Sequence, residues 1–180
     1  RRRTQTDRAR KTLAGQRVRA ARASWASNSS GNARGGWARP RRTSPPRSCA
    51  ATAMRATVVD ASALAAVLFD EPEAEPIVAS VSGMLIAPTL LRYEMASVCT
   101  VKQLRHPDRA VEIHGRYRLL DSLAIEYHEP DWAGLPILAS RWALSAYDAA
   151  YLQLALGRKA VLVTLDARLA AAWDHATARG

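Results

Sequence analysis

The sequence predicts a layered α/β fold built on a parallel β-sheet. Short apolar runs alternate along the chain with longer segments of helical character, which is the pattern of repeated strand–helix units. These runs lie between polar residues, as strands buried on both faces of a parallel sheet do. Acidic residues follow the runs or lie in the helices beside them. Because ligands bind at the carboxyl ends of strands in such sheets, we expect a functional site at that edge.

The charge divides the chain into a basic leader, residues 1–53, and a slightly acidic domain, residues 54–180. The leader holds 14 Arg and Lys against one acid, Asp7, a net charge of +13. The domain holds 12 basic residues against 15 acids, a net charge of −3. The leader is rich in Arg, Ser, Ala and Gly, and this composition predicts disorder because it buries little apolar surface. The basic character of the chain therefore comes from the leader.

Three interpretations of the leader remain open. It is a basic arm that contacts nucleic acid through phosphates, a targeting peptide rich in Arg and Ser, or upstream sequence attached to a domain that begins at Met54. The chain contains two cysteines, Cys49 and Cys99, without metal-binding spacing, which favours a reducing, cytoplasmic setting. No apolar run approaches the roughly 20 residues of a membrane span.

The elements of the domain follow from apolar periodicity and from breaker residues. We expect strands at 56–60, 84–87, 123–127 and 160–164, with room for a fifth only if a short strand follows Trp173. We expect helices at 62–69, 73–81, 89–104, 108–121, 131–143, 145–156 and 167–176.

Breaker residues set several of these boundaries. Pro76 fits only the first turn of its helix, and Gly83 ends that helix. His106-Pro107 separates two helices, and Gly157 suits the stop of the helix before it. Pro136 favours a later start for the helix at 131–143.

Four acids stand out near the carboxyl ends of the strands: Asp60, Glu94, Asp148 and Asp166. Each also has a structural interpretation. Asp60 and Asp166 suit helix N-caps, and Asp148 suits a capping box with Ser145. Glu94 has Leu90, Leu91 and Met95 as neighbours, so either it turns to solvent or it needs a partner or a cation.

Together, these acids predict a divalent metal site. Carboxylates that share a pocket repel one another and resist ionisation, and a metal ion removes that conflict. Mg²⁺ and Mn²⁺ prefer oxygen ligands. A bound divalent ion activates water and neutralises charge on a phosphoryl oxygen, which is chemistry suited to cutting phosphodiesters. The sequence has no nucleophile elbow, Walker A loop or dinucleotide-binding motif, and its four histidines lack metal-ligand spacing.

Four segments resemble the PIN-domain family, and specifically the VapC-type toxins of bacterial type II toxin–antitoxin systems. They are 58–64 (VVDASAL), 91–98 (LRYEMASV), 145–155 (SAYDAAYLQLA) and 162–169 (LVTLDARL). The resemblance implies a three-layer α/β/α domain with metal-dependent endoribonuclease activity. It maps the family's acidic set onto Asp60, Glu94, Asp148 and Asp166, with Ser62 and Thr164 as supporting hydroxyls.

The resemblance also implies an RNA substrate, Mg²⁺ or Mn²⁺ as cofactor, a homodimer, and a cognate antitoxin that blocks the site. The basic leader departs from the family pattern. Two alternatives are kept beside the toxin hypothesis. One is a PIN-like module that binds RNA without cutting it, and the other is a nucleic-acid-binding protein in which residues 1–53 do the binding.

Overall fold

The computed structural model describes residues 56–178. The leader and the start at Met54 therefore lie outside the described residues. Four strands form one parallel sheet in the order β3-β2-β1-β4. They are β1 (Ala56–Val59), β2 (Met84–Pro88), β3 (Ile125–His128) and β4 (Val161–Val163). The prediction of four parallel strands is confirmed, and no fifth strand occurs between residues 56 and 178.

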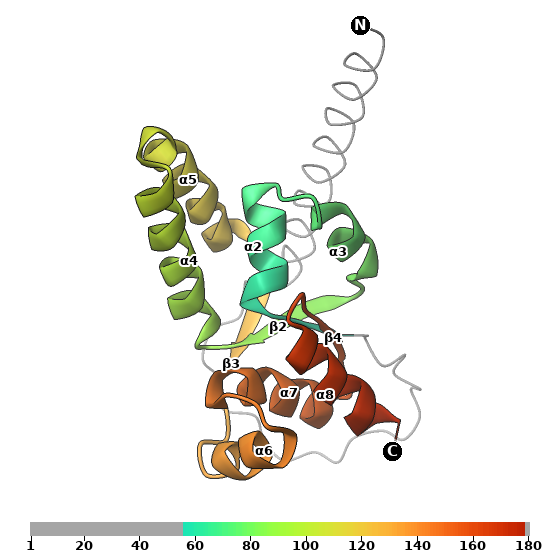
Figure 1. Cartoon of the computed structure of the whole chain (residues 1–180). Coiled ribbons are helices and arrows are strands. Elements are labelled where there is room, and N and C mark those ends of the chain that lie inside the picture. The colour runs from blue at the N-terminus through green and yellow to red at the C-terminus, as the bar shows by residue number, and fades with distance from the viewer. Residues whose placement is uncertain (1–55, 179–180) are drawn as a thin grey trace, which may run out of the picture.

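Helices cover both faces of this sheet and make three layers, as Figure 1 shows. One face carries α2 (Ala61–Phe69), α3 (Ala74–Ser80), α4 (Leu91–Arg105) and α5 (Ala110–Tyr117). The other face carries α6 (Leu135–Trp142), α7 (Ala146–Arg158) and α8 (Ala167–Thr177). The predicted α/β/α architecture is confirmed. Short 3-10 turns, η1 (Pro107–Arg109) and η2 (Arg118–Ser122), flank α5.

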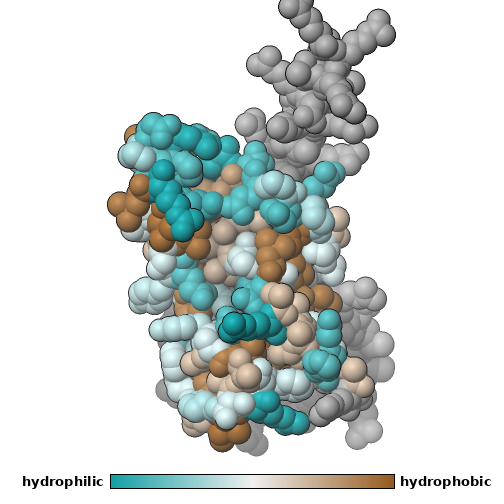
Figure 2. All heavy atoms as spheres, viewed as in Figure 1, coloured by the Kyte–Doolittle hydropathy of each residue, from teal (hydrophilic) through white to brown (hydrophobic). Residues whose placement is uncertain are grey.

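The central helices are held by an apolar core. In α2, every residue from Ala63 to Leu68 is buried, and this helix lies between α3 and the α4–α5 pair. On the opposite face, α7 buries Tyr151 and Leu152 and contacts β1, β2 and β4. The outer end of the α4–α5 pair is hydrophilic, as the teal surface in Figure 2 shows. Within residues 56–178, none of the helices combines the length and the apolar character needed to cross a bilayer.

Three predicted boundaries need correction. The prediction that Gly157 stops α7 is wrong: the helix runs through Gly157 to Arg158, and Lys159 takes the left-handed conformation (φ 50°) beyond it. The helix predicted at 108–121 ends at Tyr117 and continues as the 3-10 turn η2. Gly83 lies beyond the end of α3 at Ser80, where its positive φ of 72° turns the chain into β2.

Truncation of the core side of α7 should destabilise the domain strongly. Leu152 is fully buried in the main core cluster, so Leu152→Ala removes apolar contacts and leaves a cavity. We expect the free energy of unfolding in urea to fall by about 2–5 kcal/mol. The control Ile137→Ala removes a side chain that is 74% exposed and should change stability by less than about 0.5 kcal/mol. Equal losses in the two variants would contradict this packing.

Candidate active site

Asp60 lies at the junction of β1 and α2 and is only 6% exposed. Its carboxylate caps α2 by accepting a hydrogen bond from the backbone N–H of Ala63 at 2.8 Å. The hydroxyl of Ser62 donates to the same carboxylate, at 2.8 and 2.9 Å from its two oxygens. The hydroxyl of Thr164, just after β4, donates to it at 2.8 Å. The carboxylate is thus fixed by donors from two strand–helix turns.

Asp166 lies in the second of these turns and caps α8. It accepts hydrogen bonds from the N–H groups of Arg168 and Leu169 at 2.8 and 3.0 Å. The Thr164 hydroxyl accepts from the Asp166 N–H at 2.9 Å, and the Ser62 hydroxyl accepts from the N–H of Leu165 at 2.9 Å. These bonds join the ends of β1 and β4, which are neighbouring strands. They therefore bring Asp60 and Asp166 to the same edge of the sheet.

Glu94 reaches the site from the first turn of α4, and its carboxylate accepts a hydrogen bond from the hydroxyl of Tyr151 on α7. Tyr151 is 2% exposed. Because α4 and α7 cover opposite faces of the sheet, this hydrogen bond joins the two helical layers. Glu94 is half-buried. The alternative that it turns away into solvent is therefore wrong, because a buried hydroxyl satisfies its carboxylate.

Asp148 lies in the first turn of α7. Ser145 caps this helix, since its hydroxyl accepts from the Asp148 N–H at 3.1 Å and donates to the Asp148 carboxylate at 2.8 Å. The predicted helix start with paired Ser145 and Asp148 is confirmed. Asp60, Asp148 and Asp166 thus all take part in helix N-termini, and these structural roles place their charges beside the strand ends.

The electrostatics link the four acids into one group. Burial raises the pKa of the Asp60 carboxyl above its ordinary value, against the lowering effect of its hydrogen bonds, and the charge of Asp166 raises it further. Burial also raises the pKa of Glu94, and the charges of Asp60 and Asp148 add to the rise. The pKa of the Tyr151 hydroxyl is raised by burial and by Glu94, so Tyr151 remains a proton donor. The acids are therefore close enough to oppose one another's ionisation.

This arrangement fits a divalent cation. Within residues 56–178, no Lys, Arg or His side chain forms an ion pair with any of the four acids. Buried negative charge without a cationic partner is costly, and the available donors are all oxygens, which Mg²⁺ and Mn²⁺ prefer. In the same part of the chain, no three His, Cys, Asp or Glu side chains are grouped to hold an ion directly. The four acids thus match these ions in ligand type, and the described residues do not bring three of them together as direct ligands.

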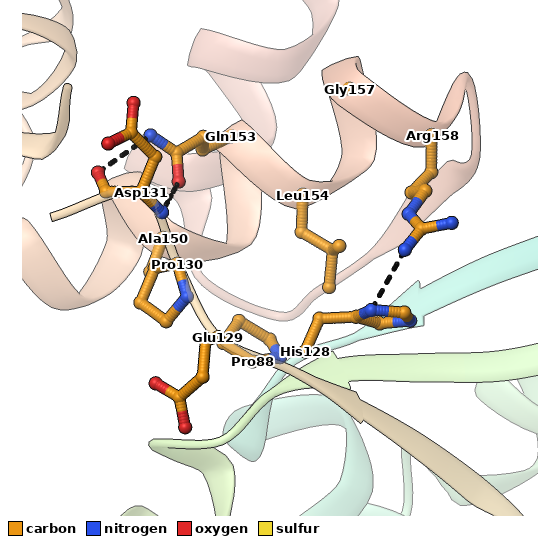
Figure 3. A pocket seen from close by; sticks show the side chains of 10 residues that line it. All are labelled: Pro88, His128, Glu129, Pro130, Asp131, Ala150, Gln153, Leu154, Gly157 and Arg158. Atoms are coloured by element: carbon orange, nitrogen blue, oxygen red, sulfur yellow. Dashed lines mark hydrogen bonds between the residues drawn. The ribbon is translucent and has the colours of Figure 1, made fainter.

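Two hollows lie near this edge of the sheet. One, of about 760 Å³, includes Glu94 in its lining but none of the other three acids. The other, of about 290 Å³ and shown in Figure 3, is lined by His128, Arg158 and Gln153 among others and contains none of the four acids. In it Arg158 lies 2.9 Å from the Nδ1 atom of His128. Of these two hollows, only the first is therefore lined by one of the four acids.

Residues 57–173 match the family model of the PIN domain. This match covers well over half of the chain and includes all four acids. The chain belongs to the PIN domain family. A PIN domain is generally a nuclease fold, and PIN domains typically use a divalent metal.

A solved structure has a similar fold. The crystal structure of PAE2754 from Pyrobaculum aerophilum is similar to this chain, with 26% sequence identity and a TM-score of 0.51. The similarity covers 72% of this chain and 90% of that one. No curated protein matches the chain. The predicted PIN resemblance is therefore confirmed at the level of the family.

Sequence reasoning named the four acids and two hydroxyls that the structure links at this edge of the sheet, but it missed Tyr151. The structure brings Asp60, Glu94, Asp148 and Asp166 into one electrostatic group, and it places Ser62 and Thr164 as hydroxyl donors to Asp60. Their roles in metal binding and catalysis remain predictions. Tyr151 stands one helical turn after Asp148 on an apolar helix. A buried tyrosine needs a partner for its hydroxyl, and this was the signal that could have pointed to it.

Proposed function

We propose that this PIN domain is a metal-dependent endoribonuclease that acts in the cytoplasm as the toxin of a bacterial type II toxin–antitoxin pair. The observation that carries the nuclease part is the group of mutually repelling carboxylates at the strand ends, of which Asp60 is buried and the other three are half-buried, without a cationic partner among the described residues. A divalent cation bound there would neutralise phosphate charge and activate a water for attack on an RNA phosphodiester.

The residues of the chain have distinct tasks in this proposal. Asp60 would be the central ligand, because it is the most enclosed of the acids and is held rigidly by Ser62, Thr164 and the Ala63 N–H. Glu94, oriented by Tyr151, and Asp148, oriented by Ser145, would hold the ion or its waters. Asp166 would add negative charge next to Asp60.

The toxin part of the proposal rests on the resemblance of four segments to VapC-type toxins. The same resemblance supports a homodimer and a cognate antitoxin that blocks the acidic site. The alternative is a PIN-like module that binds RNA without cleaving it, which has the same fold and needs no working set of acids.

Cleavage of RNA by the full chain tests the nuclease proposal. We expect purified protein to cut total RNA with Mg²⁺ or Mn²⁺ and to lose this activity in excess EDTA, because the acids need a cation to act on a phosphate. Activity should return when Mg²⁺ exceeds the chelator. Binding of RNA without cleavage in either metal would support the non-catalytic alternative, and full cleavage in EDTA would contradict the metal-dependent mechanism.

A further inference from the structure

A cluster of exposed aromatic side chains surrounds the hollow beside Glu94. Tyr93, Trp132 and Tyr147 all line it and are 79%, 66% and 65% exposed. They come from the start of α4, the loop between β3 and α6, and the start of α7, so three distant segments contribute one ring each. Tyr93 directly precedes Glu94, and Tyr147 directly precedes Asp148. The aromatic hollow therefore shares Glu94 with the acidic site.

The loop that carries Trp132 is held in place. Gln153 on α7 accepts a hydrogen bond from the Asp131 N–H at 2.8 Å and donates to the Asp131 carbonyl at 3.2 Å, as the dashed lines in Figure 3 show. The Asp131 carboxylate accepts from the N–H of Ala133 at 3.2 Å. Gly134 packs closely as well, because a Cβ there would lie 2.7 Å from Asp131 Oδ2. The backbone on both sides of Trp132 is thus fixed before any ligand arrives.

The charges of the residues that line the hollow favour stacking of nucleotide bases over binding of phosphates as its main contact with a ligand. Among the described residues that line it, Arg92 is the one Lys or Arg, against Glu94 and Glu129. The Arg92 guanidinium lies 4.4 Å from the centre of the Tyr127 ring, where a cation–π contact holds it. One fixed guanidinium can meet one phosphate, and exposed rings can stack on unpaired bases.

We infer that Tyr93, Trp132 and Tyr147, together with Arg92, form a base-stacking subsite for the single-stranded RNA that enters the acidic site. This inference rests on the proposed function, since it names how the same site holds its substrate. It selects single strands because the bases of a duplex are stacked on one another and cannot reach the rings. A single strand would place its bases on the rings and one phosphodiester beside the four acids.

Binding of a fluorescein-labelled RNA of about ten nucleotides tests the subsite. The full chain carries Asp60→Asn in every sample so that the RNA stays intact, and anisotropy is read with Mg²⁺ at raised salt, where phosphate contacts are weak. We expect Trp132→Ala, Tyr93→Ala and Tyr147→Ala each to weaken binding about 5- to 150-fold. Trp132→Phe keeps a ring and should retain most of the affinity. The same RNA as a duplex should bind more weakly.

Leu104→Ala is the matched control, because Leu104 is 78% exposed and lies outside the hollow. Unchanged binding in all three alanine variants would overturn the subsite. An equal loss of RNA affinity in Leu104→Ala would also overturn it. If the alanine variants changed the oligomeric state and not the RNA affinity, the rings would belong to a protein interface. This test does not depend on cleavage. RNA binding that depends on the rings supports the subsite even if no variant of the chain cuts RNA. Cleavage together with binding that does not depend on the rings would overturn the subsite but not the proposed nuclease function.

Discussion

Asp60→Asn should abolish RNA cleavage while the domain stays folded. Asparagine keeps the shape of the side chain and an oxygen that can cap α2 through the Ala63 N–H, but it removes the negative charge. We expect the cleavage rate to fall by about 10²–10³-fold or more, the scale seen when one preorganised electrostatic group is removed from an active site. Single-turnover cleavage of a labelled RNA measures the effect. Expression of the wild-type chain should arrest bacterial growth, and expression of Asp60→Asn should not.

The stability of this variant distinguishes a functional loss from an unfolded protein. Because burial raises the pKa of Asp60 in the folded state, its charged form is less favourable there than in the unfolded chain at neutral pH. Asp60→Asn removes this cost, so its melting temperature without metal should equal or exceed that of the wild type. Asp174→Asn neutralises an exposed acid on α8 and should keep full activity. Full cleavage by Asp60→Asn would refute the central role of this carboxylate.

Mg²⁺ should stabilise the folded protein, and more so as the pH rises. The raised pKa values of Asp60 and Glu94 mean that the folded state binds more protons than the unfolded state above the ordinary carboxyl range of about 4. Without metal, these two groups therefore contribute stability at acidic pH that is lost as the pH rises through their folded pKa values. A cation favours the ionised carboxylates and competes with those protons, so its effect has the opposite pH dependence.

Calorimetry at about pH 5 and about pH 8, with Mg²⁺ or with EDTA at matched ionic strength, measures this linkage. At about 100 times the dissociation constant, Mg²⁺ should add about 2.7 kcal/mol, or about 5–10 °C in melting temperature, at the higher pH. The shift should be small at the lower pH. The double variant Asp60→Asn and Glu94→Gln should lose it. An equal Mg²⁺ effect in that variant would show that the ion binds elsewhere.

The fold was largely predictable because its signals are local. Apolar strands followed by capped helices gave the sheet, and Asp60 and Asp166 proved to be N-caps as their positions indicated. The errors lie at the ends of helices, where more than one neighbouring residue can end the helix. Gly157 favoured a helix stop, but α7 continues one residue further and Lys159 takes the left-handed turn. The predicted helix at 108–121 changes to a 3-10 turn after Tyr117.

The site was predictable in its acids but not in the contacts between layers. The carboxyl ends of parallel strands meet at one edge, so acids placed there converge whatever the details of packing. The bond between Tyr151 and Glu94 joins α7 to α4 across 57 residues of sequence, and no periodicity within either helix reveals it. The aromatic hollow was missed for the same reason, because Tyr93, Trp132 and Tyr147 become neighbours only when their three segments are folded together.

The capping role of Asp60 and Asp166 has a consequence for relatives of this chain that have lost their enzymatic task. Such relatives would still keep a residue with a side-chain oxygen at both positions, because α2 and α8 need an N-cap. Asparagine or serine would satisfy that need as well as aspartate. Stability of the fold alone gives no reason to retain a negative charge at position 60. Aspartate at this position would therefore mark homologues that are still active, and asparagine or serine would mark homologues that are not.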